Sequence, residues 1–181
     1  MSKELLPVGV RRDDSYYTRI TWASTTEGDP RLWVLNIIDD DTTRDGGTWG
    51  GNDENSTDVV LDFFGESQKV SKIRIYKNVG IAISVLEELA KEIDVFSCND
   101  DTPAKLLRTA EDKIDAVDWK LQGTMKIVKE EGWQELVFDE PFDAKFIRLQ
   151  ARDNFCKRDE TFIPWIEFNE VKIYGESEET L

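Results

Sequence analysis

Residues 36–49, NIIDDDTTRDGGTW, bring together the densest set of groups that can bind a cation or a ligand. Three consecutive aspartates follow an apolar run, and two threonines, an arginine, paired glycines and a tryptophan come next. Calcium takes about six to eight oxygen ligands from carboxylates and backbone carbonyls, so a tight acidic loop suits it. The same residues also fit a solvated turn in which Asp39 caps its own backbone, or the rim of a ligand pocket. The stretch alone leaves these three interpretations open.

Several kinds of catalysis are excluded by composition. The chain has no histidine, which removes the commonest general base, every histidine metal site and any Ser-His-Asp or Cys-His mechanism. Carboxylate pairs remain possible, but no motif sets two of them across a cleft. Cys98 and Cys156 match no zinc spacing. The prediction is one disulfide between them if the chain is exported, or two buried thiols if it is not.

The net charge of −15 over 181 residues restricts the partners. It disfavours nucleic acids and anionic membranes, since both require a basic surface, and it leaves calcium, neutral sugars and basic protein surfaces. The length fits one domain spanning residues 1–181. No run approaches the roughly 20 apolar residues of a membrane span. The first ten residues lack the apolar centre of a secretory signal, so we expect a chain that stays inside the cell or an extracellular module excised after its leader.

The elements that must position these groups are short strands. KIRIYK, KFIRLQ and EVKIYG place an apolar side chain at every second residue, the period of a strand with one buried face. Turn residues separate such segments, and this alternation is typical of a β-sandwich or barrel. The predicted strands lie within residues 17–22, 59–63, 70–76, 92–97, 119–128, 134–138, 145–150 and 170–174.

Two segments depart from the strand pattern. From Ser84 to Lys91, Leu86, Leu89 and Ala90 fall on one helical face with Ser84 as a possible cap, which predicts a short peripheral helix. Residues 102–116 are ambiguous between a helical turn and a long loop.

Six segments follow one another in a characteristic order along the chain. They are the aspartate loop with Trp49, DVVLDFFG at 58–65, VSKIRI at 70–75, EIDVFSCND at 92–100, FIRL at 146–149 and PWIEFNEVKIYG at 164–175. This ordered set resembles the discoidin-like, or coagulation-factor type C, domains of the galactose-binding-like superfamily, and it is closest in pattern to family 32 carbohydrate-binding modules. The resemblance covers roughly residues 15–175 and implies an eight-stranded antiparallel jelly-roll β-sandwich.

In the carbohydrate-binding members of this family, an aspartate loop and a glutamate of the last strand coordinate one calcium. Carried over by position, the resemblance implies side-chain ligands from Asp39 and Glu170, with a structural rather than catalytic role for the metal. The remaining implied ligands are the backbone carbonyls of Asn36, Asp41 and Asn169, with Thr43, beside Arg44, in the place of the family's threonine. Asp40 replaces the usual glycine of the loop.

The resemblance also implies a ligand surface built by loops at one end of the sandwich. Aromatic rings cover the C–H face of a sugar, and planar donors bind paired hydroxyls. Trp49 fits equally well as a core residue beneath its loop, and Arg152 and Asn154 fit equally well as solvated loop residues. The implied ligand-binding residues are Arg44, Trp49, Asn52, Lys77, Asn78, Arg152, Asn154 and Phe155.

The resulting hypothesis is a non-catalytic module that binds a carbohydrate or glycoconjugate and carries a structural calcium. The alternative is a protein-interaction or adhesion domain of the same fold without a sugar ligand. The family often has a histidine in the ligand loop that corresponds to residues 151–165, and this chain has none, so no sugar preference is transferred.

Overall fold

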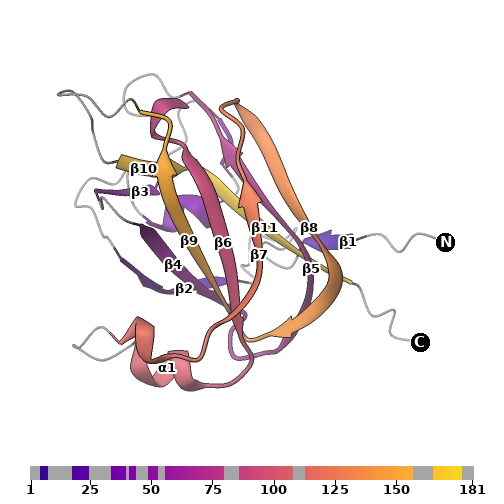
Figure 1. Ribbon diagram of the computed structural model, residues 1–181. Coiled ribbons are helices and arrows are strands. Elements are labelled where there is room, and N and C mark those ends of the chain that lie inside the picture. Colours follow the sequence, from indigo (N-terminus) through magenta and orange to yellow (C-terminus); the bar gives the residue numbers. More distant parts are fainter. Residues whose placement is uncertain are drawn as a thin grey trace.

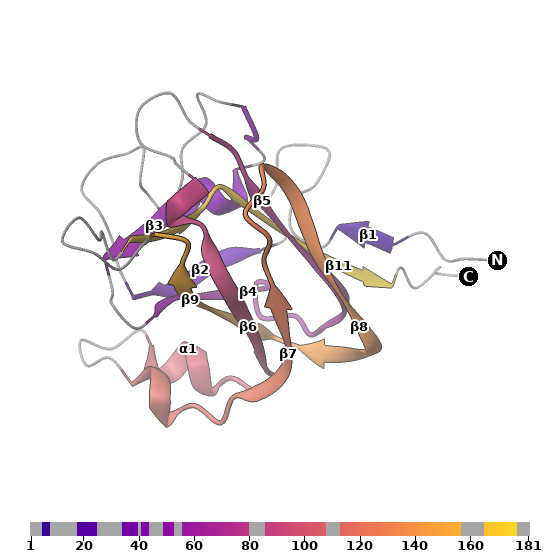
Figure 2. The ribbon, with the colours of Figure 1, turned by 45° about the horizontal axis from the view of Figure 1, so that its top comes forward.

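The computed structural model describes residues 5–7, 18–24, 34–39, 41–43, 49–52, 56–79, 86–107, 113–156 and 165–176. Its strands form two antiparallel sheets that face each other, with a short two-stranded ribbon at one end (Figures 1 and 2). One sheet has the order β1 (Leu5–Pro7), β11 (Glu170–Glu176), β5 (Gln68–Lys77) and β8 (Gly132–Ala144). The other has the order β2 (Arg19–Ala23), β4 (Thr57–Asp62), β9 (Phe146–Asn154), β6 (Ala90–Cys98) and β7 (Lys120–Lys126). The ribbon pairs β3 (Trp49–Asn52) with β10 (Trp165–Phe168).

The main core lies between the sheets because each sheet turns one apolar face inward. In β5, Ile73 and Ile75 are buried while Arg74 between them is partly exposed. The register pairs these two residues with Ile173 and Val171 of β11. The period of two read in the sequence is therefore the period of burial in this sheet.

A second apolar cluster covers the outer face of the five-stranded sheet. Every residue of β4 is buried, because the main core lies against one face and this cluster against the other. Val60 packs there with Leu107, Ile114 and Phe146. The covering segment contains the helix α1 (Thr102–Leu106) and the 3-10 turn η4 (Ile114–Ala116), seen below the sheets in Figure 1.

The predicted antiparallel jelly-roll sandwich is confirmed, with three short strands, β1, β3 and β10, in addition to the eight longer ones among the described residues. The predicted helix over 84–91 is wrong in its described part: residues 86–88 form a 3-10 turn, η3, and β6 begins at Ala90. Leu89 pairs with Glu167 in an isolated bridge and Ala90 pairs with Asn154. Tertiary pairing thus overrides a local helical preference. The helix occurs instead in the segment that the sequence left ambiguous.

Both cysteines are free thiols. Cys98 is buried as predicted for the reduced state, whereas Cys156 is partly exposed, so the prediction that both thiols are buried is wrong for Cys156. Among the described residues, no helix has the length and apolar character needed to cross a membrane.

Candidate functional site

The aspartate loop of the sequence analysis, called the acidic loop below, starts at Asp39. It follows the 3-10 turn η2 (Val34–Ile38), which is anchored in the core by the buried side chains of Ile37 and Ile38. Asp39 Oδ1 accepts a hydrogen bond from the Asp41 backbone N–H at 2.9 Å. Asp41 Oδ1 in turn accepts from the Thr43 N–H at 2.9 Å and the Thr43 hydroxyl at 2.6 Å. The aspartates therefore hold the loop in successive side-chain-capped turns, as one of the sequence interpretations predicted.

The same loop meets the start of β11. Glu170 is completely buried, and its side chain lies within hydrogen-bonding reach of the Asp39 carboxyl group. Burial raises the pKa of Asp39, and the neighbouring Asp41 charge acts in the same direction, whereas the Asp41 N–H and Glu170 oppose the rise. Two adjacent carboxyl groups repel each other when both are ionised, and a shared proton, hydrogen-bond donors or a bound cation offsets that repulsion.

Asn78 links the acidic loop to the start of β11 through hydrogen bonds. Its Nδ2 donates to the Thr43 carbonyl at 2.6 Å, and its backbone N–H donates to Asn169 Oδ1 at 3.0 Å. The Asn169 N–H donates to the Tyr76 carbonyl at 2.9 Å. These bonds connect the loop segment that contains Thr43 to the segment that contains Asn169, at the start of β11. Asn78 itself is 1% exposed, so we assign it a bridging role rather than direct ligand contact.

Lys77, another predicted ligand residue, is also interior. It is 1% exposed and forms an ion pair with Glu167, which is completely buried. Burial lowers the pKa of Lys77, while the Glu167 carboxylate opposes that change. The sequence analysis did not predict Glu167 as the partner of Lys77. Its only signal was an acidic residue inside the apolar run WIEF, and the strand that pairs with this run cannot be predicted from local sequence.

Two further predicted ligand residues lie inside the protein. Trp49 is completely buried and packs edge-on against Phe168, with ring centroids 5.4 Å apart. It therefore belongs to the core, the alternative already considered for it. Asn154 is 1% exposed, and its Oδ1 accepts from the Cys156 N–H at 3.0 Å, which fixes the turn that follows β9. These two assignments as direct ligand contacts are corrected accordingly.

The remaining described candidates, Arg152 and Phe155, retain access to solvent. Arg152 is 41% exposed and pairs with Glu92 at 3.1 Å and Asp94 at 2.7 Å. Phe155 is partly buried against the main core, and Lys91 Nζ lies 5.8 Å from the centre of its ring.

Two predicted ligand residues are incompletely described. Arg44 falls outside the described residues. Asn52 has its backbone in β3, paired with Trp165, and its side chain is outside the description.

Comparisons with known proteins give structural but not sequence matches. No family model and no curated protein matches the sequence. The structure is similar to the family 32 carbohydrate-binding module of C. perfringens NanJ in complex with galactose, at 15% identity and a TM-score of 0.64, covering 93% of this chain and 99% of that one.

Two other solved structures extend the similarity. The family 32 module of Streptococcus pneumoniae EndoD matches at 12% identity and a TM-score of 0.64, over 94% of this chain and 99% of that one. The fucolectin of striped bass, Morone saxatilis, matches at 13% identity and a TM-score of 0.60, over 88% of this chain and 47% of that one. The chain therefore has the discoidin-like, galactose-binding-like fold that these proteins share.

Proposed function

We propose that the protein is a non-catalytic module that binds a carbohydrate or glycan through the loop end of the sandwich. The observation that carries this proposal is the similarity to carbohydrate-binding modules over more than nine-tenths of this chain and nearly all of theirs. Because fold alone does not determine function, the site chemistry and a binding experiment must support it.

The class of sugar is only partly constrained. Solved structures of this fold are described as complexes with galactose, with GalNAc-β-1,3-galactose and with unsaturated mannuronic acid, and another as chitosan-binding. This variety shows that the fold does not set the sugar. The net charge of −15 on this chain opposes anionic polysaccharides by Coulomb repulsion, so we expect a neutral or cationic glycan.

The proposed contact surface lies around the end of β9. Arg152 supplies planar donors and Phe155 supplies an aromatic ring, the two group types that recognise hydroxyls and the C–H face of a sugar. The backbone N–H of Phe155 donates to the Glu87 carbonyl at 2.8 Å, which holds the ring's segment against η3. The family resemblance adds Arg44 and Asn52 as further proposed contacts.

A structural calcium belongs to the same proposal. Across the described residues, no three Cys, Asp or Glu side chains converge as a metal-binding group, so the carboxylates alone do not form a full site. Asp39 and buried Glu170 supply adjacent carboxylates, and the nearby carbonyls of Asn36, Asp41 and Asn169 are oxygen donors of the kind calcium prefers. These donors fit calcium, which would brace the acidic loop against β11.

The test of glycan binding is a glycan array followed by affinity electrophoresis on the glycans that score. We expect Arg152→Ala and Phe155→Ala to weaken binding by about tenfold or more, the size expected for a central contact. Arg74→Ala is the matched control, because Arg74 lies on the other sheet, where its guanidinium stacks 4.8 Å from the Trp133 ring centre.

Each result bears on a separate part of the proposal. Absence of any glycan signal from the folded protein would reject sugar binding and favour the protein-interaction alternative. Sugar binding that survives both substitutions would reject the proposed surface while leaving the function intact.

A further inference from the structure

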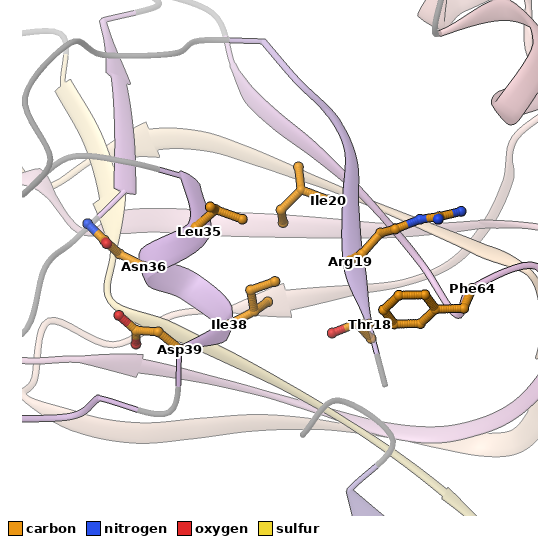
Figure 3. Close-up of a pocket in the computed structure, with 8 residues that line it drawn as sticks. All are labelled: Thr18, Arg19, Ile20, Leu35, Asn36, Ile38, Asp39 and Phe64. Atoms are coloured by element: carbon orange, nitrogen blue, oxygen red, sulfur yellow. The ribbon is translucent and has the colours of Figure 1, made fainter. Parts of the chain in front are cut away.

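A cavity of about 450 Å³ opens on the side of the sandwich, between η2, the start of β2 and the turn that follows β4. Its lining residues do not include Arg152 or Phe155 of the proposed glycan surface, and they include Asp39, at the start of the acidic loop. Figure 3 shows the side chains of Ile20, Leu35 and Ile38 around its middle. The volume falls within the range of small-molecule sites.

Its mouth is formed by large apolar groups that face solvent. Leu35 is 54% exposed and Phe64 is 51% exposed, and both line this one cavity. Single exposed apolar side chains are ordinary, whereas apolar groups gathered at a concave site indicate a ligand or a partner.

The turn that holds Phe64 at the cavity has an unfavourable backbone conformation. Its φ is 57° and that of Gly65 is 88°, so both central residues of this tight turn are left-handed, a geometry that strongly favours Asn-Gly. A bulky aromatic residue in this region is uncommon, and strained residues of this kind cluster at ligand sites. The Phe64 N–H donates to Asp62 Oδ1 at 2.8 Å, which helps hold the turn.

Charged groups line the cavity beside its apolar middle. Arg19 lies with its guanidinium carbon 5.2 Å from the Phe64 ring centre, and its Nε pairs with buried Asp62 at 2.9 Å. Asp39 lines the cavity from the other side of Ile38. A charged ligand group seated against the apolar side chains of the middle would lose its hydration without an opposite charge in contact with it, so an uncharged ligand is favoured there.

We propose that this cavity is a second binding site, specific for a small uncharged aromatic ring that packs against Phe64 and Leu35. Such a ring matches the apolar middle of the cavity and the edge-on or offset packing that aromatic pairs prefer. The ring belongs to a small molecule, such as an aromatic substituent on a glycoside or a free phenol. The two residues that would hold the ring, Phe64 and Leu35, belong to neither the proposed calcium site nor the proposed glycan surface.

The experiment compares three probes of nearly equal shape: 2-naphthol, 2-naphthoate and 2-naphthylmethylammonium. Binding is measured by calorimetry in the presence of a chelator, and the site is located by amide NMR shifts. We expect 2-naphthol to bind about fivefold or more tightly than either charged probe, with shifts at residues 18–20 and 35–39. Equal affinity for all three, or shifts confined to other residues, would overturn the proposal.

The decisive variant is Phe64→Asn. Asparagine tolerates the left-handed backbone, so we expect its melting temperature to equal or exceed that of the wild type while affinity for 2-naphthol falls about tenfold. Leu35→Asn tests the opposite wall if Phe64→Asn is poorly folded. Val137→Asn, at a 58% exposed apolar position on β8, is the control and should change affinity by less than about twofold. Unchanged binding in both cavity variants, or an equal loss in the control, would refute the site.

Discussion

Lys77 and Glu167 neutralise each other inside the protein, because each is almost completely buried and their side chains are paired. Removing one partner leaves the other as an uncompensated buried charge. We expect Lys77→Met or Glu167→Gln to lower the free energy of unfolding by about 3–5 kcal/mol, measured by urea denaturation.

A matched surface pair provides the control for this prediction. Lys126 also pairs with a glutamate, Glu92, but its side chain is 72% exposed. Lys126→Met should therefore cost less than about 1 kcal/mol. If both lysine substitutions cost the same small amount, the interior pair does not carry the energetic role assigned to it.

Glu88 makes stability depend on pH. Burial, and then the nearby Glu167 charge, raise its pKa from the usual 4.5 to about 7, while Lys77 opposes the rise and Glu87 adds to it. The folded state therefore binds this proton more tightly than the unfolded state, so its contribution to stability is full below pH 4.5 and is lost as pH rises through about 7.

The variant Glu88→Gln isolates this effect. Melting temperatures should be nearly equal for the variant and the wild type below pH 4.5, and the variant should melt higher above pH 7, where only the wild type carries the charge. A constant difference across this range would show that Glu88 does not titrate as described.

At the scale of elements, the acidic loop after η2 is joined to β11 by the adjacent carboxyl groups of Asp39 and Glu170. Calcium between them would stabilise the folded state by binding it preferentially. At about 100 times the dissociation constant, we expect the melting temperature to rise by roughly 5–10 °C over its value in chelator.

Two substitutions sharpen the calcium test. Asp39→Asn should abolish the rise, whereas Asp139→Asn, at an exposed position of β8, should preserve it. An unchanged melting temperature of the wild type with calcium and with chelator would rule out the calcium proposal.

The segment containing α1 and η4 is a second structural unit, because it forms its own apolar cluster on the outer sheet face. Leu107 is 6% exposed within that cluster, so Leu107→Ala should cost about 2–5 kcal/mol of unfolding free energy in urea denaturation. Leu121→Ala, at a 52% exposed position, should stay within about 0.5 kcal/mol of the wild type. If Leu107→Ala cost as little unfolding free energy as Leu121→Ala, the cluster would contribute no packing energy.

For the whole molecule, the strand pattern predicted the architecture because the alternation of apolar residues is a local property of each strand. Ile73 and Ile75 are buried as their spacing predicts. The helix over 84–91 failed for the converse reason: Leu89 and Ala90 pair with β10 and β9, which are distant in sequence and invisible to local reasoning.

The sequence by itself determined the antiparallel sandwich, the absence of histidine chemistry and the acidic loop that meets the last long strand. Tertiary structure alone decided which polar residues face solvent. Lys77, Asn78 and Asn154 look like surface residues by type, yet each is 1% exposed. Lys77 pairs with Glu167 of β10 and Asn78 bonds to Thr43 and Asn169, whereas Asn154 accepts a bond from Cys156 in the turn that follows it. A residue's type states what it can bind, but only the packing of distant segments decides whether a ligand can reach it.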